Sequence, residues 1–228
     1  MNVDGDIIFA NPNNPTGLMV PVKDIERLVK ADSKRMVIID EAYIDYADES
    51  CLPLATKYPN LVVVRTFSKS RNMAGTHVGF AVASREIIED MNKIKFSFNP
   101  FNLNSITMAA GIASVRDVDY LKECVKKTIS VREKTEKQLE KLGFHVIPSK
   151  ANFLFVSHDQ VSSSQLCKAL KEEGILTRHF ADAKLNKYLR ITMGTSDEMK
   201  VVMIAIKEIL EEYAHENTNM RLCECYGK

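Results

Sequence analysis

Apolar and polar positions along the first half of the chain predict strands and helices in alternation. The runs Ile7–Phe9, Val37–Ile39 and Leu61–Arg65 are rich in β-branched residues and nearly continuous, which is typical of strands buried on both faces. A stripe of apolar residues at helical spacing, near Pro21–Ala31, separates the first two runs. This order predicts a βαβ unit, and therefore a mostly parallel sheet.

The second half has longer helical periods and shorter strands. Val118–Leu142 has the spacing of an amphipathic helix, and Gly143 ends it. Thr195 and Glu198 have capping-box spacing for a terminal helix. The expected strands are Phe144–Pro148, Phe153–Val156, Ile175–Phe180 and Tyr188–Met193. The pattern predicts an α/β chain, with a large domain over residues 1–115, a small α+β domain over 116–215 and a tail over 216–228.

Composition narrows the class of partner. The 228 residues are 45% hydrophobic, enough for a sizeable core, and 31 basic and 30 acidic residues are spread along the chain. Because no basic block stands out, neither nucleic acid nor a membrane surface is expected as a partner. No apolar run has the length of a membrane span and the start is unlike a leader, so a cytoplasmic location is expected.

The five cysteines have no metal-ligand spacing and fit a reducing compartment, so no metal site is predicted. Cys223 and Cys225 are compatible with half of a metal or redox site. A polar tail is the favoured interpretation, since no second pair of ligands accompanies them.

Polar residues that could bind a ligand or take part in catalysis follow each of the three apolar runs. The motif NPNNPTG comes after the first, Asp40 and Tyr43 after the second, and Lys69 after the third. Ligands of open α/β sheets bind beyond the carboxyl ends of the strands, so these residues are expected in one crevice. Taken singly, each has an ordinary alternative: a turn asparagine, a capping aspartate, a packing tyrosine and a surface lysine.

The motifs NPNNPTG, DEAY, TFSK followed by AG and VGF, and LRITMGT together resemble those of fold-type I pyridoxal-phosphate (PLP) enzymes. The closest resemblance is to the histidinol-phosphate aminotransferase branch of the class II aminotransferases, over residues 7–213. It implies a partial PLP-transferase large domain, in which the strand Val78–Ala83 is antiparallel, followed by a small C-terminal domain. It also implies PLP as cofactor and a homodimer or higher association.

The resemblance assigns roles to individual residues. Lys69 would bind the PLP aldehyde covalently and later move a proton, and Asp40 would pair with the pyridine nitrogen. Arg190 would hold the carboxylate or phosphate of the substrate, and Arg178 its phosphate. The implied cofactor-binding residues are Asn14 and Tyr43 at the ring oxygen, Thr66 and Ser68 at the phosphate, and Asp40, Lys69 and His77.

His77 is a departure from the family pattern. It stands eight residues after Lys69, where the family has an arginine that binds the cofactor phosphate. Imidazole cannot offer the two parallel donors of a guanidinium. Loss of one charged contact is worth ~1.5–3 kcal/mol, or roughly ten- to 150-fold in affinity.

A second departure concerns length. The family has a long N-terminal portion before the NPNNPTG motif, and no counterpart is found before Asn11. A truncated homologue is therefore expected, with uncovered apolar rows at Val37–Ile39 and Val62–Val64.

Three functions remain open. The first is transamination of histidinol phosphate with 2-oxoglutarate, in histidine biosynthesis. The second is PLP-dependent decarboxylation of a phosphorylated amino acid, because fold does not fix reaction type. The third is a non-catalytic remnant or a subunit that depends on a partner, favoured by His77 and by the missing portion.

Overall fold

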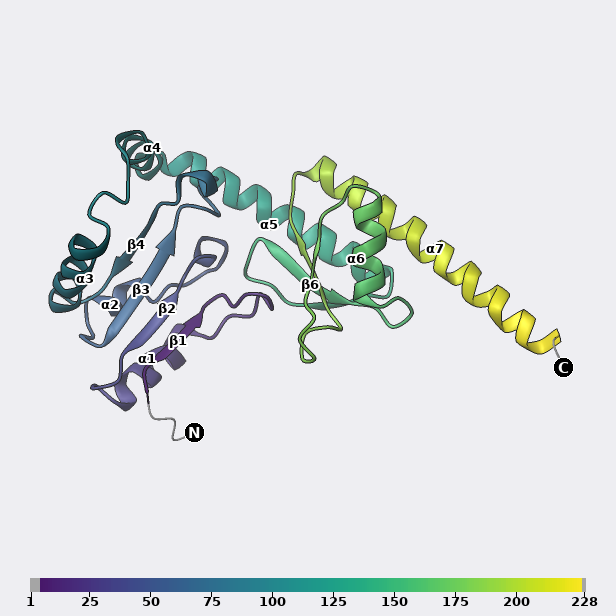
Figure 1. The fold of residues 1–228 in the computed structure, drawn as a ribbon, viewed down its shortest axis with the longest axis horizontal. Helices are drawn as coiled ribbons and strands as arrows, with labels where there is room; N and C mark the ends of the chain where they lie inside the picture. The colour runs from purple at the N-terminus through teal and green to yellow at the C-terminus, as the bar shows by residue number, and fades with distance from the viewer. Residues whose placement is uncertain (1–4, 227–228) are drawn as a thin grey trace. The chain divides into compact units, whose positions relative to one another are not determined.

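The computed structural model describes residues 5–226 of the chain (Figure 1). It divides into two compact units, Met1–Lys127 with Ser149–Ala151, and Thr128–Pro148 with Asn152–Lys228. The division falls within helix α5 (Val118–Lys141). The domain boundary that the sequence predicts near residue 116 stays a prediction.

The first unit is built on a four-stranded sheet in the order β1-β2-β3-β4. Its strands are β1 (Ile7–Ala10), β2 (Val37–Asp40), β3 (Leu61–Thr66) and β4 (Gly79–Val82). The first three are parallel, and β4 runs antiparallel to β3. The expected mostly parallel α/β sheet, with an antiparallel strand after the lysine turn, is confirmed.

Helices α1 (Val22–Ala31) and α2 (Leu52–Ala55) contribute to the core on this sheet. Ile25 and Val29 of α1 pack with Val37, Ile39 and Val63, all of which are buried. Val62 is also buried. The prediction of uncovered rows at Val37–Ile39 and Val62–Val64 is therefore wrong for Val37, Ile39, Val62 and Val63. Ile38 and Val64 are only half-buried and lie outside this core cluster.

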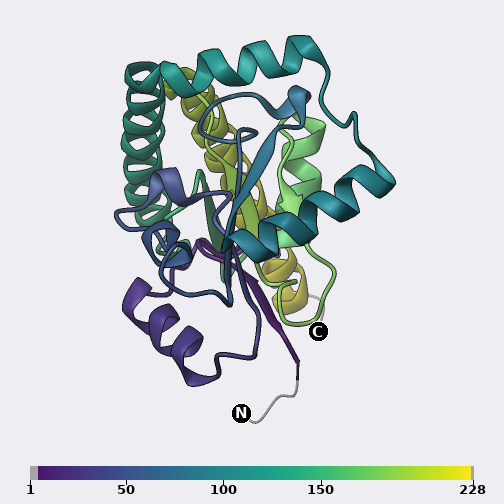
Figure 2. The same ribbon diagram turned by 90° about the vertical axis from the view of Figure 1, so that its left-hand side faces the viewer.

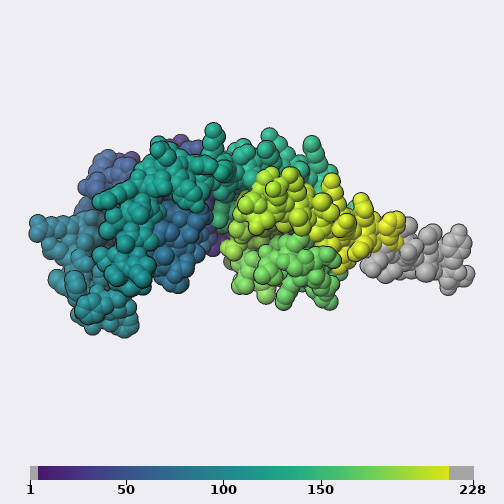
Figure 3. Space-filling model, turned by 90° about the horizontal axis from the view of Figure 1, so that it is seen from above, coloured from purple at the N-terminus to yellow at the C-terminus, as the bar shows by residue number. Residues whose placement is uncertain are grey.

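Exposed apolar side chains gather instead on the next two helices, α3 (Arg85–Phe98) and α4 (Ser105–Arg116). Among the described residues of α3, none is buried. Ile94 is 69% exposed and Ile106 81%. These helices can be followed in Figure 2, and their surface in the space-filling view of Figure 3.

The second unit contains an antiparallel sheet in the order β5-β6-β8-β7. Its strands are β5 (His145–Ile147), β6 (Phe153–Ser157), β7 (Arg178–His179) and β8 (Leu189–Thr192). The strand expected at Ile175–Phe180 is only the short β7, since Gly174 ends the preceding turn and residues 175–177 are irregular.

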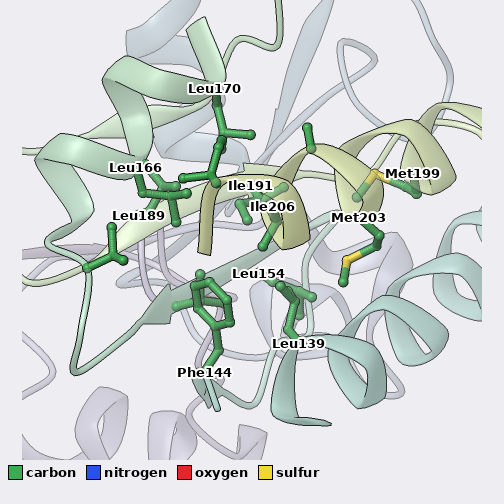
Figure 4. Close-up of a cluster of buried hydrophobic side chains, with 14 of the residues drawn as sticks. Leu139, Phe144, Leu154, Leu166, Leu170, Leu189, Ile191, Met199, Met203 and Ile206 are labelled. Atoms are coloured by element: carbon green, nitrogen blue, oxygen red, sulfur yellow. The ribbon is translucent and has the colours of Figure 1, made fainter. Parts of the chain in front are cut away.

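Helices α6 (Ser163–Glu172) and α7 (Ser196–Tyr226) share the core of this unit with the end of α5. Figure 4 shows Leu139, Leu154, Leu166 and Ile206 in this core, with other apolar side chains.

The capping box expected at the start of α7 is confirmed. The Thr195 amide donates to Glu198 Oε2 at 2.6 Å, and the Glu198 amide donates to Thr195 Oγ1 at 3.3 Å. The tail predicted over 216–228 is helical as far as Tyr226. The side chains of Cys223 and Cys225 lie outside the described ones.

Within residues 5–226, no helix is long and apolar enough to cross a membrane. The same residues hold no group of histidine, cysteine or acidic side chains that could bind a metal ion.

Candidate functional site

The carboxyl ends of the three parallel strands lie level with one another. Ala10 pairs with Asp40, and Asp40 pairs with Val64. The pairing continues one residue further, because the Asn11 amide donates to the Asp40 carbonyl at 2.9 Å and the Glu41 amide to the Val64 carbonyl at 2.8 Å. The segments that carry the NPNNPTG motif, Asp40 and Lys69 therefore leave the sheet at the same edge.

Lys69 lies in the turn after β3, where the Asn72 amide donates to its carbonyl at 3.0 Å. Its Nζ lies 5.5 Å from the centre of the Tyr43 ring. Tyr43 is itself buried, at the start of the 3-10 helix η1 (Ile44–Tyr46). A cation over a tyrosine ring is held by the ring quadrupole, so the lysine amine has a defined place above Tyr43.

Asp40 ends β2 half-buried, and its Oδ1 accepts a hydrogen bond from the Ala42 amide at 2.9 Å. This bond fixes the carboxylate at the strand end. Asn14, by contrast, lies exposed in the loop after β1.

Asn11, a residue that the sequence analysis did not single out, holds this loop. It is buried, its Nδ2 donates to the Val20 carbonyl at 3.0 Å, and its Oδ1 accepts from the Val20 amide at 2.7 Å. The first asparagine of the motif therefore stabilises the loop. Its position directly after a buried strand could have indicated this structural role from the sequence.

Thr66 and Ser68 form a hydroxyl pair at the end of β3. The Thr66 hydroxyl donates to Ser68 Oγ at 2.9 Å, and the Ser68 amide donates to Thr66 Oγ1 at 3.0 Å. His77 is exposed after the short helix η2 (Ala74–Thr76), with a left-handed backbone at φ 54°. Arg71 packs on the Phe67 ring and donates to the Ser114 carbonyl, so its guanidinium has protein partners.

A buried carboxylate that the sequence analysis missed lies beside these residues. The Glu41 side chain is 0% exposed and receives two hydrogen bonds from Arg65, at 2.9 and 3.0 Å. It also accepts from the Cys51 amide at 2.6 Å and from the Ser50 hydroxyl at 2.8 Å. Burial, followed by the charge of Glu41, raises the pKa of the Cys51 thiol to about 12, so this thiol stays protonated at neutral pH.

The second unit brings Arg178 and Arg190 together. The two residues are directly opposite on β7 and β8. Their guanidinium carbons lie 5.7 and 5.9 Å from the centre of the Phe180 ring, and that of Arg190 lies 5.2 Å from the Phe153 ring. Like charges directly opposite in a sheet repel each other, and a bound anion would relieve this repulsion. The pair therefore has the chemistry of an anion site.

Comparison with known proteins establishes the class of this chain. Residues 4–206 match the family model of class I and II aminotransferases, and the chain belongs to this family. It is 44% identical to the histidinol-phosphate aminotransferase of Brachyspira hyodysenteriae over 211 residues. These residues make up 92% of this chain and 60% of the relative. The chain thus spans about 60% of the length of the curated relatives it matches.

Solved structures of the same fold include enzymes with different names. The histidinol-phosphate aminotransferase of Sinorhizobium meliloti, in complex with pyridoxal-5'-phosphate, is 28% identical with a TM-score of 0.81, over 90% of this chain and 57% of that chain. A decarboxylase from Sulfurospirillum multivorans is also 28% identical, with a TM-score of 0.79, over 89% of this chain and 55% of its own.

Proposed function

We propose that the first unit binds PLP through Lys69 and that the protein transfers the amino group of histidinol phosphate to 2-oxoglutarate, in histidine biosynthesis. The observation that carries the proposal is the position of Lys69 Nζ over Tyr43, at the sheet edge that also bears Asp40. Family membership and the names of the relatives support it.

The donor set at this edge fits PLP. Lys69 offers a primary amine for the aldehyde and Asp40 a carboxylate for the protonated pyridine nitrogen. Tyr43 and Asn14 offer a phenol and an amide for the ring oxygen. The residues left for the phosphate are the hydroxyls of Thr66 and Ser68 and the imidazole of His77, which carry less positive charge than the family's arginine.

PLP, when bound, supplies an aldehyde that condenses with an amine with loss of water, and a ring that accepts the electron pair of the substrate Cα. Lys69 Nζ would take the proton from the substrate Cα as a general base. Asp40 would pair with the protonated ring nitrogen, and the Tyr43 ring would help to hold the lysine amine in place. Arg178 and Arg190 bind the phosphate of the substrate.

Two substrates separate transamination from decarboxylation. Histidinol phosphate has an amino group but no carboxylate to lose, whereas O-phosphothreonine has both. We expect glutamate to form from 2-oxoglutarate and histidinol phosphate, and no CO2 to be released from O-phosphothreonine. CO2 release would favour the alternative function. A protein that binds PLP but converts neither substrate would favour a subunit that depends on a partner.

Arg190→Ala is expected to raise the KM for histidinol phosphate by at least tenfold, because a charged hydrogen-bonding partner of the anion is lost. Arg85→Ala is the matched control, since Arg85 is an exposed arginine paired with Glu89 at 2.7 Å. Steady-state kinetics of both variants test the assignment. An equal KM in the two would remove Arg190 from the substrate site.

His77→Arg is expected to strengthen PLP binding about tenfold, by restoring part of a charged contact to the phosphate. Both side chains occupy the same left-handed backbone position, at φ 54°, so the change tests mainly the side-chain charge. Titration of PLP into the two proteins measures the effect. Equal dissociation constants would show that residue 77 does not reach the phosphate.

We also propose a cytoplasmic protein that self-associates through the exposed apolar side chains of α3 and α4. Ile106→Glu is expected to shift the sedimentation profile towards smaller species. Leu176→Glu is the control, because Leu176 is equally exposed, at 81%, but lies in the second unit. Identical profiles for the two variants would contradict association through these helices.

A further inference from the structure

A continuous chain of polar side chains links the segments that carry the proposed PLP residues. Glu41 directly follows Asp40, and Ser70 directly follows Lys69. Tyr43 directly precedes helix η1, which contains Asp45. The members of this chain, called the polar chain below, are Glu41, Arg65, Asp45 and Ser70.

Glu41 and Arg65 form the rigid end of the polar chain. The Glu41 carboxylate is fully buried and accepts from Arg65, Ser50 and the Cys51 amide. Arg65 Nη2 donates in addition to Ser50 Oγ at 2.7 Å. A buried carboxylate with its partners in place cannot exchange them without leaving a charge unpaired, so the end of β2 is fixed to β3.

Asp45 and Ser70 form the other end. Arg65 Nη1 lies 3.9 Å from Asp45 Oδ1, and the Ser70 hydroxyl donates to Asp45 Oδ2. Ser70 is only 3% exposed. A hydroxyl bond to an ionised carboxylate is stronger than a neutral one, so this bond ties the turn after Lys69 to helix η1.

We propose that Ser70 and Asp45 are positioning residues, which act through Lys69 by holding its turn against helix η1, which directly follows Tyr43. The proposal rests on the proposed PLP site. Through Arg65 and Glu41 the same polar chain extends to the residue after Asp40, so the lysine amine and the ring-nitrogen carboxylate share one rigid support. The Glu41–Arg65 pair holds the ends of β2 and β3 together, and the hydrogen bond from Ser70 to Asp45 fixes the position of Lys69.

The test uses Ser70→Ala, Asp45→Asn and the double variant in the full chain. Hydrogen exchange of the segment 66–73 is measured without PLP, and the pH midpoint of the visible absorbance of bound PLP is measured with it. Ser163→Ala is the matched control: Ser163 is 4% exposed and its hydroxyl donates to the Lys187 carbonyl in the second unit. It removes an equally buried hydroxyl far along the chain from Lys69.

We expect all single variants to lower the thermal midpoint. Only Ser70→Ala and Asp45→Asn should accelerate exchange in 66–73, by about tenfold, and the double variant should add little, because the two residues act through one bond. The same variants should move the pH midpoint of the PLP absorbance, which a purely structural role would leave in place.

Unchanged exchange of segment 66–73 in Ser70→Ala would overturn the proposal, whether or not PLP binds. Faster exchange with an unmoved pH midpoint would also overturn it, because the turn would then be stabilised without setting the lysine. Absence of PLP absorbance in the unaltered protein would instead reject the proposed function, and hydrogen exchange would decide whether the polar chain holds the turn.

Discussion

Lys69→Ala is expected to abolish transamination and the visible absorbance of bound PLP. Removal of the amine eliminates the only covalent link proposed for the cofactor and the base that takes the Cα proton. A general base alone contributes typically 10²–10⁴-fold to the rate, so the loss in kcat should be at least of that order. Spectroscopy and steady-state turnover of the purified variant measure both effects.

Lys57→Ala is a close control for this change. Lys57 Nζ also lies over a tyrosine ring, 5.1 Å from the centre of Tyr58, but it pairs with Glu26 on the surface. The control is expected to keep both absorbance and turnover. Equal activity of Lys69→Ala and Lys57→Ala would mean that a lysine over a tyrosine has no special role at residue 69.

Glu41→Gln is expected to lower the free energy of unfolding by about 3 kcal/mol. The neutral amide leaves the half-buried guanidinium of Arg65 with only Asp45, at 3.9 Å, as an acidic partner, and breaking a buried pair from one side typically costs 3–5 kcal/mol. Urea denaturation followed by circular dichroism measures the change.

Glu26→Gln serves as its control. Glu26 is a solvent-accessible carboxylate whose pKa is lowered to about 2 by hydrogen bonds from Tyr58, Lys57 and Lys30. Solvent screens exposed ion pairs, so the urea midpoint at neutral pH should move much less than in Glu41→Gln. Equally small shifts for the two variants would show that the Glu41–Arg65 pair does not stabilise the first unit.

Local patterns were sufficient to predict the first sheet. The runs that become β1, β2 and β3 are short and rich in β-branched residues, and a clear helical stripe separates the first two. The spacing of apolar residues and the length of each run therefore identify the strands. The positions of Asp40 and Lys69 at the same edge follow from this sheet, since parallel strands end together. The capping box at Thr195 was predictable because both of its partners lie within four residues.

Features that depend on contacts between distant residues were not predictable in the same way. The apolar runs of β2 and β3 do not show which residues cover them, yet Ile25 and Val29 pack on Val37 and Ile39. Glu41 and Arg65 are 24 residues apart in the sequence, and the residues around them do not indicate that the two charges pair in a buried place. Likewise Arg178 faces Arg190 only because of the register between β7 and β8.

The role of Lys69 has one direct test. The protein is loaded with PLP, reduced with borohydride, digested and mapped by mass spectrometry. We expect the pyridoxyl group on the peptide that contains Lys69, and unmodified peptides at Lys57 and Lys150. A pyridoxyl group on any lysine other than Lys69 would contradict the account.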